Sequence, residues 1–360
     1  YSMKILHISF SYDFTDGGIT TVVKQIIKEQ QKANLSVNWL ASNEYFGYLR
    51  KKKFLKKIYE INPSIIHLHG LWRLHTRLAR NFVQMGIPYV ITPHGMLDNW
   101  ALRQSMIKKI ISWRLWEKYA FDNCSFVQSL CNSELETIRK INSSWKSYVI
   151  TNGINLPNKK SLSLRDRPKC WKNIIPTNAK VLLFMGRFHK KKGINELIKA
   201  WEVVSQYSYS KNWWLCLAGS GNLKILKKFD NPSEKKRIIV IKPVFNLEKE
   251  KVFRNSSAFI LSSFSEGLPM AALEAMSYGI PCLISEKCNL NETLNIGAAI
   301  KTNPSVFEII ESLKYLIQMS DKEKKSISKL AYDYVSLNHK WTNLTSQLNY
   351  LYRSVCEDIL

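Results

Sequence analysis

The fold is decided by a strand–helix–strand stretch at residues 258–285, which reads AFILSSFSEGLPMAALEAMSYGIPCLIS. Its two ends, Ala258–Leu261 and Cys282–Ser285, are short apolar runs of the kind that form fully buried strands. Between them, Met270–Tyr278 has the composition of a helix that crosses from one strand to the next. A strand, a helix and a second strand in this order predict parallel strands in one sheet with a helix on its face.

The same alternation of short apolar and longer amphipathic runs continues on both sides of a polar stretch at residues 158–172. The strands predicted before that stretch are Ile5–Phe10, Val37–Ala41, Ile65–Leu68, Tyr89–Thr92, Ser125–Ser129 and Tyr148–Thr151. The further strands predicted after it are Val181–Met185, Trp214–Ala218 and Ile238–Ile241. Because the polar stretch has the composition of a linker, the pattern predicts an α/β protein with two doubly wound parallel-sheet domains that face each other.

We expect residues 1–165 to form the first domain and residues 176–340 to form the second. Residues 341–360 are expected to form a C-terminal helix that packs back on the first domain. Ligands of doubly wound sheets bind at the carboxyl ends of the strands, where loops and helix N-termini gather. Candidate site residues should therefore follow strands, in the cleft between the domains.

The composition excludes few functions, but the net charge limits the classes of binding partner that we expect. The chain has 360 residues with 45% hydrophobic content, which is enough for two buried cores. Its 53 Lys and Arg residues against 28 Asp and Glu residues give a formal charge of +25, which favours polyanions or an anionic membrane surface. We expect a cytoplasmic protein, because no apolar run approaches the ~18 residues of a membrane span and the seven cysteines form no Cys-x-x-Cys pair.

Two glutamates flank the start of the helix in the opening stretch. Pro269 suits the first helical position, where its missing N–H is not needed, and Gly267 lets a ligand approach the backbone closely. The free amides of the helix start can bind an anion, and the carboxylates of Glu266 and Glu274 can accept hydrogen bonds from sugar hydroxyls. A capping glutamate and a solvent-facing glutamate would give the same spacing, so the spacing alone leaves both readings open.

This segment resembles the Glu-x7-Glu motif of the retaining glycosyltransferases of family 4, which have the GT-B fold. The resemblance implies that Glu266 contacts hydroxyls of the transferred sugar and that Glu274 holds the donor ribose. It also implies that the first domain binds the acceptor and that the second binds a nucleotide-sugar. The neighbouring residues that it assigns to the donor site are Gly267, Leu268, Pro269 and Met270.

A second motif, MGRFHKKKG at residues 185–193, directly follows a predicted strand. A forked guanidinium and an ammonium at a strand end can hold a diphosphate. By the resemblance, Arg187 and Lys192 neutralise the donor diphosphate and stabilise the leaving group. A charge run in so basic a chain can also be a solvated face.

A leaving diphosphate can be stabilised by a metal ion or by fixed cations and amides. No Asp-x-Asp follows a strand, and residues 13–16, DFTD, have the wrong spacing to hold a metal ion. We therefore expect no metal ion or other cofactor.

Further candidates follow other strands. Gly17 and Gly18 lie in a loop that resembles the family's N-terminal glycine loop, although two glycines can also make a tight turn. His94 lies in TPHGML at residues 92–97, and a lone histidine at a strand end can be structural or functional. The segment resembles one in bacterial surface-polysaccharide transferases whose histidine lies beside the transferred sugar. His69 is a weaker candidate at the end of its strand. Val244 follows Ile238–Ile241, where the nucleobase packs in the family, although this segment can also be a plain turn.

Two basic segments, residues 50–59 and 108–119, interleave cations with apolar residues at helical spacing. Such helices can lie in an anionic membrane interface, or their apolar faces can pack on the sheet. If these helices lie in a membrane interface, the protein is peripheral on the inner face of the cell membrane.

The preferred function is a retaining, metal-independent glycosyltransferase of cell-surface polysaccharide biosynthesis, building capsule, O-antigen or exopolysaccharide. Its donor is a UDP- or GDP-sugar, and its acceptor is a saccharide or a lipid-linked saccharide. The alternatives are a sugar-nucleotide epimerase or phosphorylase of the same architecture, or a basic nucleic-acid-binding protein. We expect no nucleic-acid partner, because no recognised nucleic-acid-binding module is present.

Overall fold

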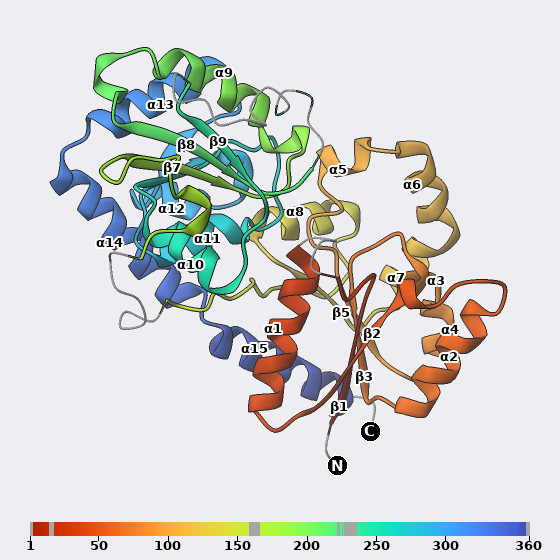
Figure 1. The fold of residues 1–360 in the computed structure, drawn as a ribbon. Coiled ribbons are helices and arrows are strands. Elements are labelled where there is room, and N and C mark those ends of the chain that lie inside the picture. The colour runs from red at the N-terminus through yellow and green to blue at the C-terminus, as the bar shows by residue number, and fades with distance from the viewer. Residues whose placement is uncertain are drawn as a thin grey trace. The chain divides into compact units, whose positions relative to one another are not determined.

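The computed structural model describes residues 3–13, 18–157, 166–221, 224, 226 and 236–357, without the side chains of residues 99 and 100. The chain forms two compact units (Figure 1). Unit 1 comprises Tyr1–Gly153 and Trp341–Leu360, and unit 2 comprises Ile154–Lys340. Residues 158–165, which include the predicted end of the first domain, lie outside the described residues.

Unit 1 is built on a six-stranded parallel sheet with the strand order β2-β1-β3-β4-β5-β6. Its strands are β1 (Lys4–Ser9), β2 (Ser36–Ala41), β3 (Ile65–His69), β4 (Tyr89–Thr92), β5 (Phe126–Ser129) and β6 (Ser147–Val149). Its helices are α1 (Gly18–Lys32), α2 (Arg50–Ile61), α3 (Leu74–Arg77), α4 (Ala79–Gln84), α5 (Asn99–Arg103), α6 (Met106–Ser112), α7 (Lys118–Asp122), α8 (Asn132–Ile141) and α15 (Trp341–Glu357). A π-helical segment, η3 (Trp113–Glu117), joins α6 to α7, and α15 packs against α1.

Unit 2 repeats this architecture with the strand order β12-β11-β10-β7-β8-β9, again all parallel. Its strands are β7 (Lys180–Met185), β8 (Trp213–Ala218), β9 (Ile238–Ile241), β10 (Ala258–Leu261), β11 (Cys282–Ser285) and β12 (Ile300–Thr302). Its helices are α9 (Ile194–Val204), α10 (Asn246–Arg254), α11 (Met270–Ser277), α12 (Asn291–Asn295), α13 (Val306–Gln318) and α14 (Asp321–Asn338).

The predicted α/β class with two doubly wound parallel sheets is confirmed. Two details of the prediction are wrong. The strand β12 was not predicted, because it has only three residues and its middle residue, Lys301, is exposed and charged. Pro269 is not the first helical residue: with φ −82° and ψ 88° it precedes α11, which begins at Met270.

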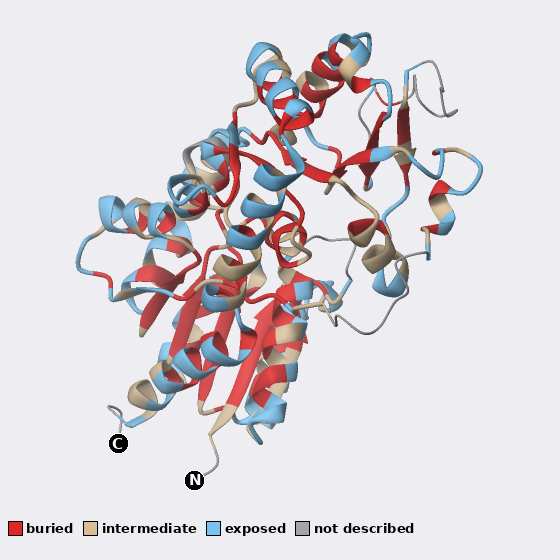
Figure 2. Ribbon diagram, turned by 90° about the vertical axis from the view of Figure 1, so that its left-hand side faces the viewer, coloured by how far each residue is buried: buried red, intermediate tan, exposed pale blue. Residues whose placement is uncertain are grey.

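The strand orders bring specific loops together. The central strands β3, β4, β8 and β10 are buried along their whole length, as strands covered on both faces should be (Figure 2). In each sheet the first strand has later strands on both sides, so β1 lies between β2 and β3, and β7 lies between β8 and β10. Such a switch point opens a crevice at the carboxyl ends of the strands. In the part of the chain that the structure describes, no helix is long and apolar enough to cross a membrane.

Candidate active site

In unit 2, the loops that follow the neighbouring strands β7 and β10 are joined by a short ion pair. The Nζ atom of Lys192 lies 2.5 Å from Oε1 of Glu266, and the two side chains are only 19% and 10% exposed. The Ser263 hydroxyl donates to the same carboxylate oxygen at 2.6 Å. A carboxylate so enclosed has a fixed direction, which a sugar-contacting group requires.

The approach of these two loops depends on a glycine. Gly193 has a φ of +65°, and a Cβ atom at this position would lie 2.1 Å from the Ser262 carbonyl oxygen. Close by, the backbone N–H of Phe264 donates to the Lys191 carbonyl at 2.8 Å. The last glycine of MGRFHKKKG is therefore required by a left-handed backbone and by close contact between the loops.

The loop that follows β11 also meets Glu266. The backbone N–H of Glu266 donates to the Lys287 carbonyl at 2.9 Å, and the Asn289 side-chain amide donates to the Glu266 carbonyl at 2.5 Å and to the Gly267 carbonyl at 3.0 Å. Loops from three adjacent strands, β7, β10 and β11, thus fix Glu266 at the switch point of the sheet. Residues after β7 and β10 contact its carboxylate, and residues after β11 contact its backbone.

Glu274, on α11, is engaged by a second cation. The Nζ atom of Lys249, on α10, lies 2.6 Å from Oε2 and 2.7 Å from Oε1 of Glu274, so the ammonium group bridges both oxygens. The side chains of Lys249 and Glu274 are 31% and 26% exposed. The carboxylate is therefore restrained yet remains open to solvent and to a ligand.

The remaining donor-site candidates differ in exposure. Arg187 is exposed just beyond the end of β7. The first turn of α11 leaves backbone amides without an intrahelical acceptor, as at any helix start. Gly267, Leu268, Met270 and Val244 are partly exposed, whereas Pro269 is buried.

The turn that follows β8 contacts the loop that follows β7. A Cβ atom on Gly219 would lie 1.9 Å from the Gly186 carbonyl oxygen, and one on Gly221 would lie 2.3 Å from the Phe188 carbonyl oxygen. These two glycines allow the backbone of one loop to lie on that of the other. They support the loop that carries Arg187.

In unit 1, His94 follows β4 in a strained turn. Its φ is 54°, a left-handed value that is uncommon for a residue other than glycine, and Gly95 continues the turn with a φ of 73°. The Glu134 carboxylate, from α8, accepts hydrogen bonds from the N–H groups of Gly95 at 2.6 Å and Leu130 at 2.7 Å. Burial raises the pKa of Glu134, and these hydrogen bonds oppose that shift. Gly18 begins α1, whereas Gly17 lies outside the described residues.

His94 is in contact with a cluster of buried histidines. Its Nε2 atom lies 3.2 Å from Nδ1 of His69, and Nε2 of His69 lies 2.9 Å from Nδ1 of His7. Desolvation by burial lowers the pKa of His7 to about 4 and that of His94 to about 3, and it lowers the pKa values of His67 and His69 well below the ordinary value. These rings are therefore neutral at pH 7.

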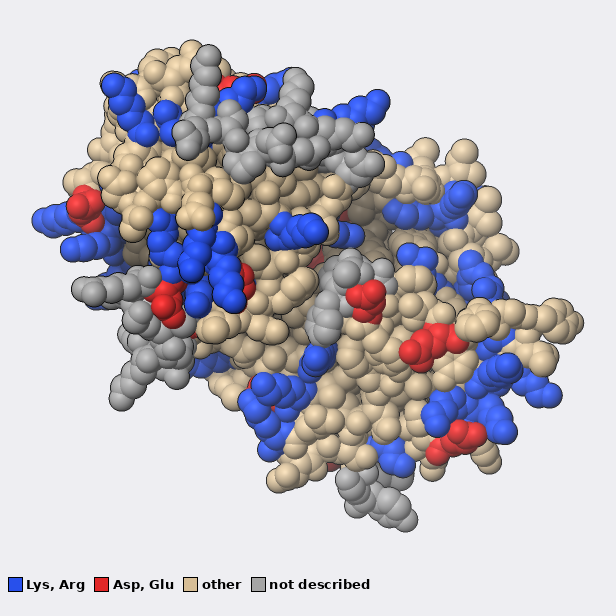
Figure 3. All heavy atoms as spheres, in the orientation of Figure 1, with Lys and Arg blue, Asp and Glu red and all other residues tan. Residues whose placement is uncertain are grey.

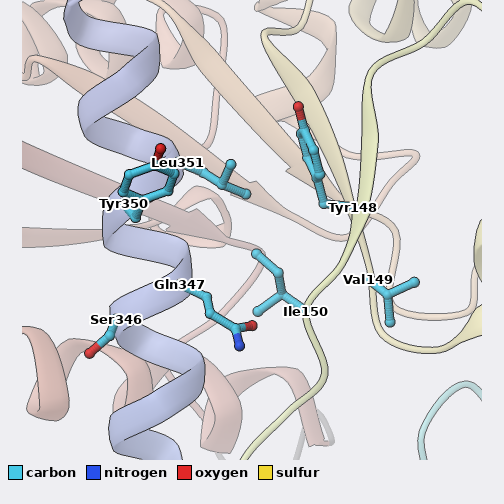
Figure 4. A pocket seen from close by; sticks show the side chains of 7 residues that line it. All are labelled: Tyr148, Val149, Ile150, Ser346, Gln347, Tyr350 and Leu351. Carbon is cyan, nitrogen blue, oxygen red and sulfur yellow. The ribbon is translucent and has the colours of Figure 1, made fainter.

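A surface pocket of about 470 Å³ lies elsewhere in unit 1 (Figure 4). It is lined by Tyr148, Val149, Ile150, Ser346, Gln347, Tyr350 and Leu351. None of these residues is charged or is a candidate from the sequence, so this pocket does not suit a diphosphate.

The fold and these loops define a class of protein. Two doubly wound parallel sheets, with fixed carboxylates and cations at a switch point, are the architecture of the GT-B glycosyltransferases. Residues 35–157 match the model of Glycosyltransferase Family 4, and residues 167–333 match that of Glycosyl transferases group 1. The chain belongs to glycosyltransferase family 4.

Individual relatives agree with this. The chain is 26% identical over 298 residues to an uncharacterized glycosyltransferase of Haemophilus influenzae, covering 78% of this chain and 76% of the relative. It is 26% identical over 253 residues to UDP-Gal:alpha-D-GlcNAc-diphosphoundecaprenol alpha-1,3-galactosyltransferase of Escherichia coli, covering 67% of this chain and 60% of that enzyme. The structure of HepE from Anabaena in complex with UDP and glucose has the same fold, with a TM-score of 0.75, 17% identity and coverage of 98% of this chain and 100% of that one. The comparisons do not favour an epimerase, a phosphorylase or a nucleic-acid-binding protein.

Several residues of the site were not predicted from the sequence. Lys249, Ser263 and Asn289 contact the two glutamates, and His7 and Glu134 support His94. Only His7 had a signal that could have been used, because it is a polar residue inside an apolar strand. Lys249, Asn289 and Glu134 are brought into place by contacts between elements distant in sequence. Ser263 lies in the same loop as Glu266, three residues before it, but belongs to no motif that would single it out.

Proposed function

We propose that the protein is a retaining, metal-independent glycosyltransferase that moves a sugar from a UDP- or GDP-sugar to a saccharide or lipid-linked saccharide. Its process would be the assembly of a cell-surface polysaccharide. The observation that carries this proposal is the position of Glu266, which the loops after three adjacent strands hold in the segment that leads into α11.

The chemistry of this end of the sheet suits a nucleotide-sugar donor. The amides of α11 and the exposed guanidinium of Arg187 favour a diphosphate, and Glu266 favours the hydroxyls of the sugar. Glu274 would accept from the ribose hydroxyls, with Lys249 holding the carboxylate in place. The UDP and glucose bound to HepE support this donor class.

Metal independence and retention complete the proposed mechanism. The leaving diphosphate would be stabilised by Arg187 and by the amides of α11. Lys192 would join them once the hydroxyls of a bound sugar form new hydrogen bonds with Glu266 and release its ammonium group. Retention rests on the Glu-x7-Glu motif. A product with inverted anomeric configuration would contradict retention. Activity that a chelator abolishes and Mg²⁺ restores would contradict metal independence.

The acceptor class is supported by the relative from Escherichia coli, whose name specifies a diphosphoundecaprenol-linked sugar as its acceptor. A lipid-linked acceptor would require the enzyme to work at a membrane surface. One of the two basic segments exposes an apolar face beside its cations, as membrane docking requires, and the other segment does not.

In α2, the apolar residues Phe54 and Ile58 are buried in the core, while the lysines point to solvent. In α6 and η3, by contrast, the apolar residues are exposed, with Ile107 at 73% and Leu115 at 62%. The exposed members of this apolar face are Met106, Ile107, Ile110, Ile111 and Leu115, and Arg103, Lys108 and Arg114 beside them are also exposed. Figure 3 shows Lys and Arg side chains gathered around α2 and α6.

We therefore propose that α6 and η3, and not α2, dock on an anionic membrane. Co-flotation with vesicles of phosphatidylglycerol and phosphatidylcholine tests this. The wild-type protein should float with them, Ile107→Glu should not, and Phe307→Glu, at an exposed position on α13 of unit 2, should behave as the wild type. Equal flotation of all three proteins would contradict the docking surface.

The enzymatic proposal is tested with purified protein and a panel of UDP- and GDP-sugars, with and without a diphosphoundecaprenol-linked sugar. The expected result is release of the nucleoside diphosphate from one donor, increased by the acceptor, with a new glycosidic bond in the lipid product. Failure of every donor, or release of a free or epimerised sugar as the only product, would contradict it.

A further inference from the structure

The histidine cluster in unit 1 is a continuous hydrogen-bonded network. His7 and His67 are direct neighbours in the pairing of β1 with β3, and His69 lies two residues further along β3. All six ring nitrogens of these three residues have hydrogen-bond partners. Because all three rings are fully buried and neutral, each carries one N–H donor and one acceptor nitrogen, and the partners decide which is which.

The direction of the first part of the network is set by a backbone carbonyl. The Ile150 carbonyl can only accept, so the Gln128 amide nitrogen donates to it at 2.8 Å. The Oε1 atom of Gln128 then accepts from the Thr92 hydroxyl at 2.9 Å. With its proton given to Gln128, the Thr92 oxygen accepts from Nε2–H of His67 at 2.6 Å. The Nδ1 atom of His67 is left as an acceptor, and the Tyr352 hydroxyl of α15 donates to it.

The same tyrosine sets the direction of the second part. The Tyr352 hydroxyl also hydrogen-bonds with the Gln30 side chain, and having donated to His67 it must accept from the Gln30 amide nitrogen. That nitrogen also donates to Oδ1 of Asn349 at 3.0 Å. The Oε1 atom of Gln30 is therefore the atom that faces Nε2 of His7 at 2.8 Å, and it accepts from it.

The order of donors and acceptors then continues to His94. With Nε2 protonated, His7 accepts at Nδ1 from Nε2–H of His69. With its own Nε2 protonated, His69 accepts at Nδ1 from Nε2–H of His94. The Nδ1 atom of His94 is left unprotonated, and among the described residues no hydrogen-bond partner of it is found.

We propose that this network fixes His94 with the proton on Nε2, so that its Nδ1 atom is a hydrogen-bond acceptor for a hydroxyl group of a sugar substrate. His69, His7, Gln30 and Tyr352 are positioning residues that act through His94. The inference rests on the proposed function for the identity of the ligand, whereas the tautomer of His94 stands on the network alone.

The network holds a proton in place and does not carry it away. Its far end is the Gln30 amide, which has no basic atom to receive a proton. An acceptor nitrogen selects a neutral hydroxyl over a phosphate or carboxylate oxygen, which can only accept. The hydroxyl can belong to the donor sugar or to the acceptor sugar.

A bound metal ion is the competing explanation of the cluster. The potential ligand atoms of His7, His67 and His69 lie within 4.8 Å of one another. A metal ion bound to them would displace hydrogen bonds that already satisfy all six nitrogens, and the network accounts for every one of these contacts. Zinc at one equivalent in the purified protein, retained after dialysis against a chelator, would overturn the proposal.

The direct test is the tautomer of each histidine in the wild-type protein at pH 7, read from long-range proton–nitrogen correlations of the imidazole rings. The expected result is an Nε2–H tautomer at His7, His67, His69 and His94. An Nδ1–H tautomer at His94 would overturn the proposal. Because this test requires no activity, it separates failure of the network from failure of the proposed transferase function.

The functional test uses Tyr352→Phe, which keeps the ring and removes the hydroxyl that orients Gln30. The His94 signals should then report a mixture of tautomers, and KM for one sugar substrate should rise about tenfold, with a smaller change in kcat. The substrate whose KM rises is the one whose hydroxyl binds Nδ1.

Tyr350→Phe, on an exposed residue of the same helix, is the control and should leave both values unchanged. An unchanged KM for both substrates in Tyr352→Phe would overturn the proposal. Should that variant fold poorly, Gln30→Leu with Gln31→Leu as its control gives the same comparison.

Discussion

The pair formed by Lys192 and Glu266 allows a sharp prediction about stability. In Lys192→Met, the Glu266 carboxylate loses the ammonium group at 2.5 Å and remains only 10% exposed. Removing one partner of a buried pair destabilises a protein by about 3–5 kcal/mol. We expect about 3 kcal/mol, the lower end, because Ser263 still donates to the carboxylate. For a unit of this size, that is a fall in Tm of roughly 6–12 °C.

The measurement is a double-mutant cycle by calorimetry with Lys192→Met, Glu266→Gln and the double variant. If the two groups form the pair, the double variant should be more stable than the sum of the single changes predicts, by about 1–3 kcal/mol. The control is the surface pair of Lys236 with Glu202, which is 46% and 40% exposed at 3.0 Å and should give less than about 1 kcal/mol. A coupling no larger than that of the control pair would show that Lys192 and Glu266 do not form a buried ion pair.

Three further changes test local parts of the structure. Gly193→Ala should destabilise unit 2 by more than about 2 kcal/mol, since its Cβ would lie 2.1 Å from the Ser262 carbonyl oxygen at a φ of +65°. Gly47→Ala, at a φ of +77° with no atom within 4 Å, should cost less, and equal falls in Tm would contradict this account. Burial raises the pKa of Glu117 from 4.5 to about 7, so its contribution to stability is present below pH 4.5 and is lost as the pH rises to 7. The Tm of Glu117→Gln relative to wild type should therefore be higher at pH 8 than at pH 5, and the opposite trend would contradict the raised pKa. Burial lowers the pKa of His75 from 6.5 to about 4, so stability should fall by about 1.4 kcal/mol per pH unit from this residue as the pH drops below 6.5. Urea unfolding of His75→Asn should show a smaller loss between pH 6.5 and 5, and an unchanged slope would contradict it.

The sequence was sufficient for the sheets but not for their smallest strand. Buried parallel strands such as Trp213–Ala218 are apolar throughout, and this makes them visible in a single sequence. The strand Ile300–Thr302 is short and carries an exposed lysine, so its pairing with β11 is a tertiary effect without a local pattern.

The site was predictable where a residue belongs to a motif. Glu266 and Lys192 were both selected from the sequence, yet their contact with each other was not expected, because Lys192 had been assigned to the diphosphate alone. Glu274 pairs with Lys249, which lies in another helix and belongs to no motif. Long-range contacts of this kind are set by the packing of the loops and cannot be read from spacing.

The histidine network shows the same limit. His67 and His69 are visible as an alternating pair, and His94 as part of a motif, but Gln30 and Tyr352 look like ordinary helix residues. Their importance follows only from the packing of α1 and α15 over the same face of the sheet.

We propose that the nucleotide-sugar donor binds at the end of the unit 2 sheet around Glu266. The most direct test of this proposal is the initial rate of nucleoside diphosphate release, at saturating acceptor, for wild type, Glu266→Gln and the surface control Glu202→Gln. We predict a loss of at least about 100-fold in Glu266→Gln, as for removal of a group that stabilises a transition state, and a rate within about twofold of wild type in the control. Equal rates for the two variants, with both proteins folded, would contradict the account.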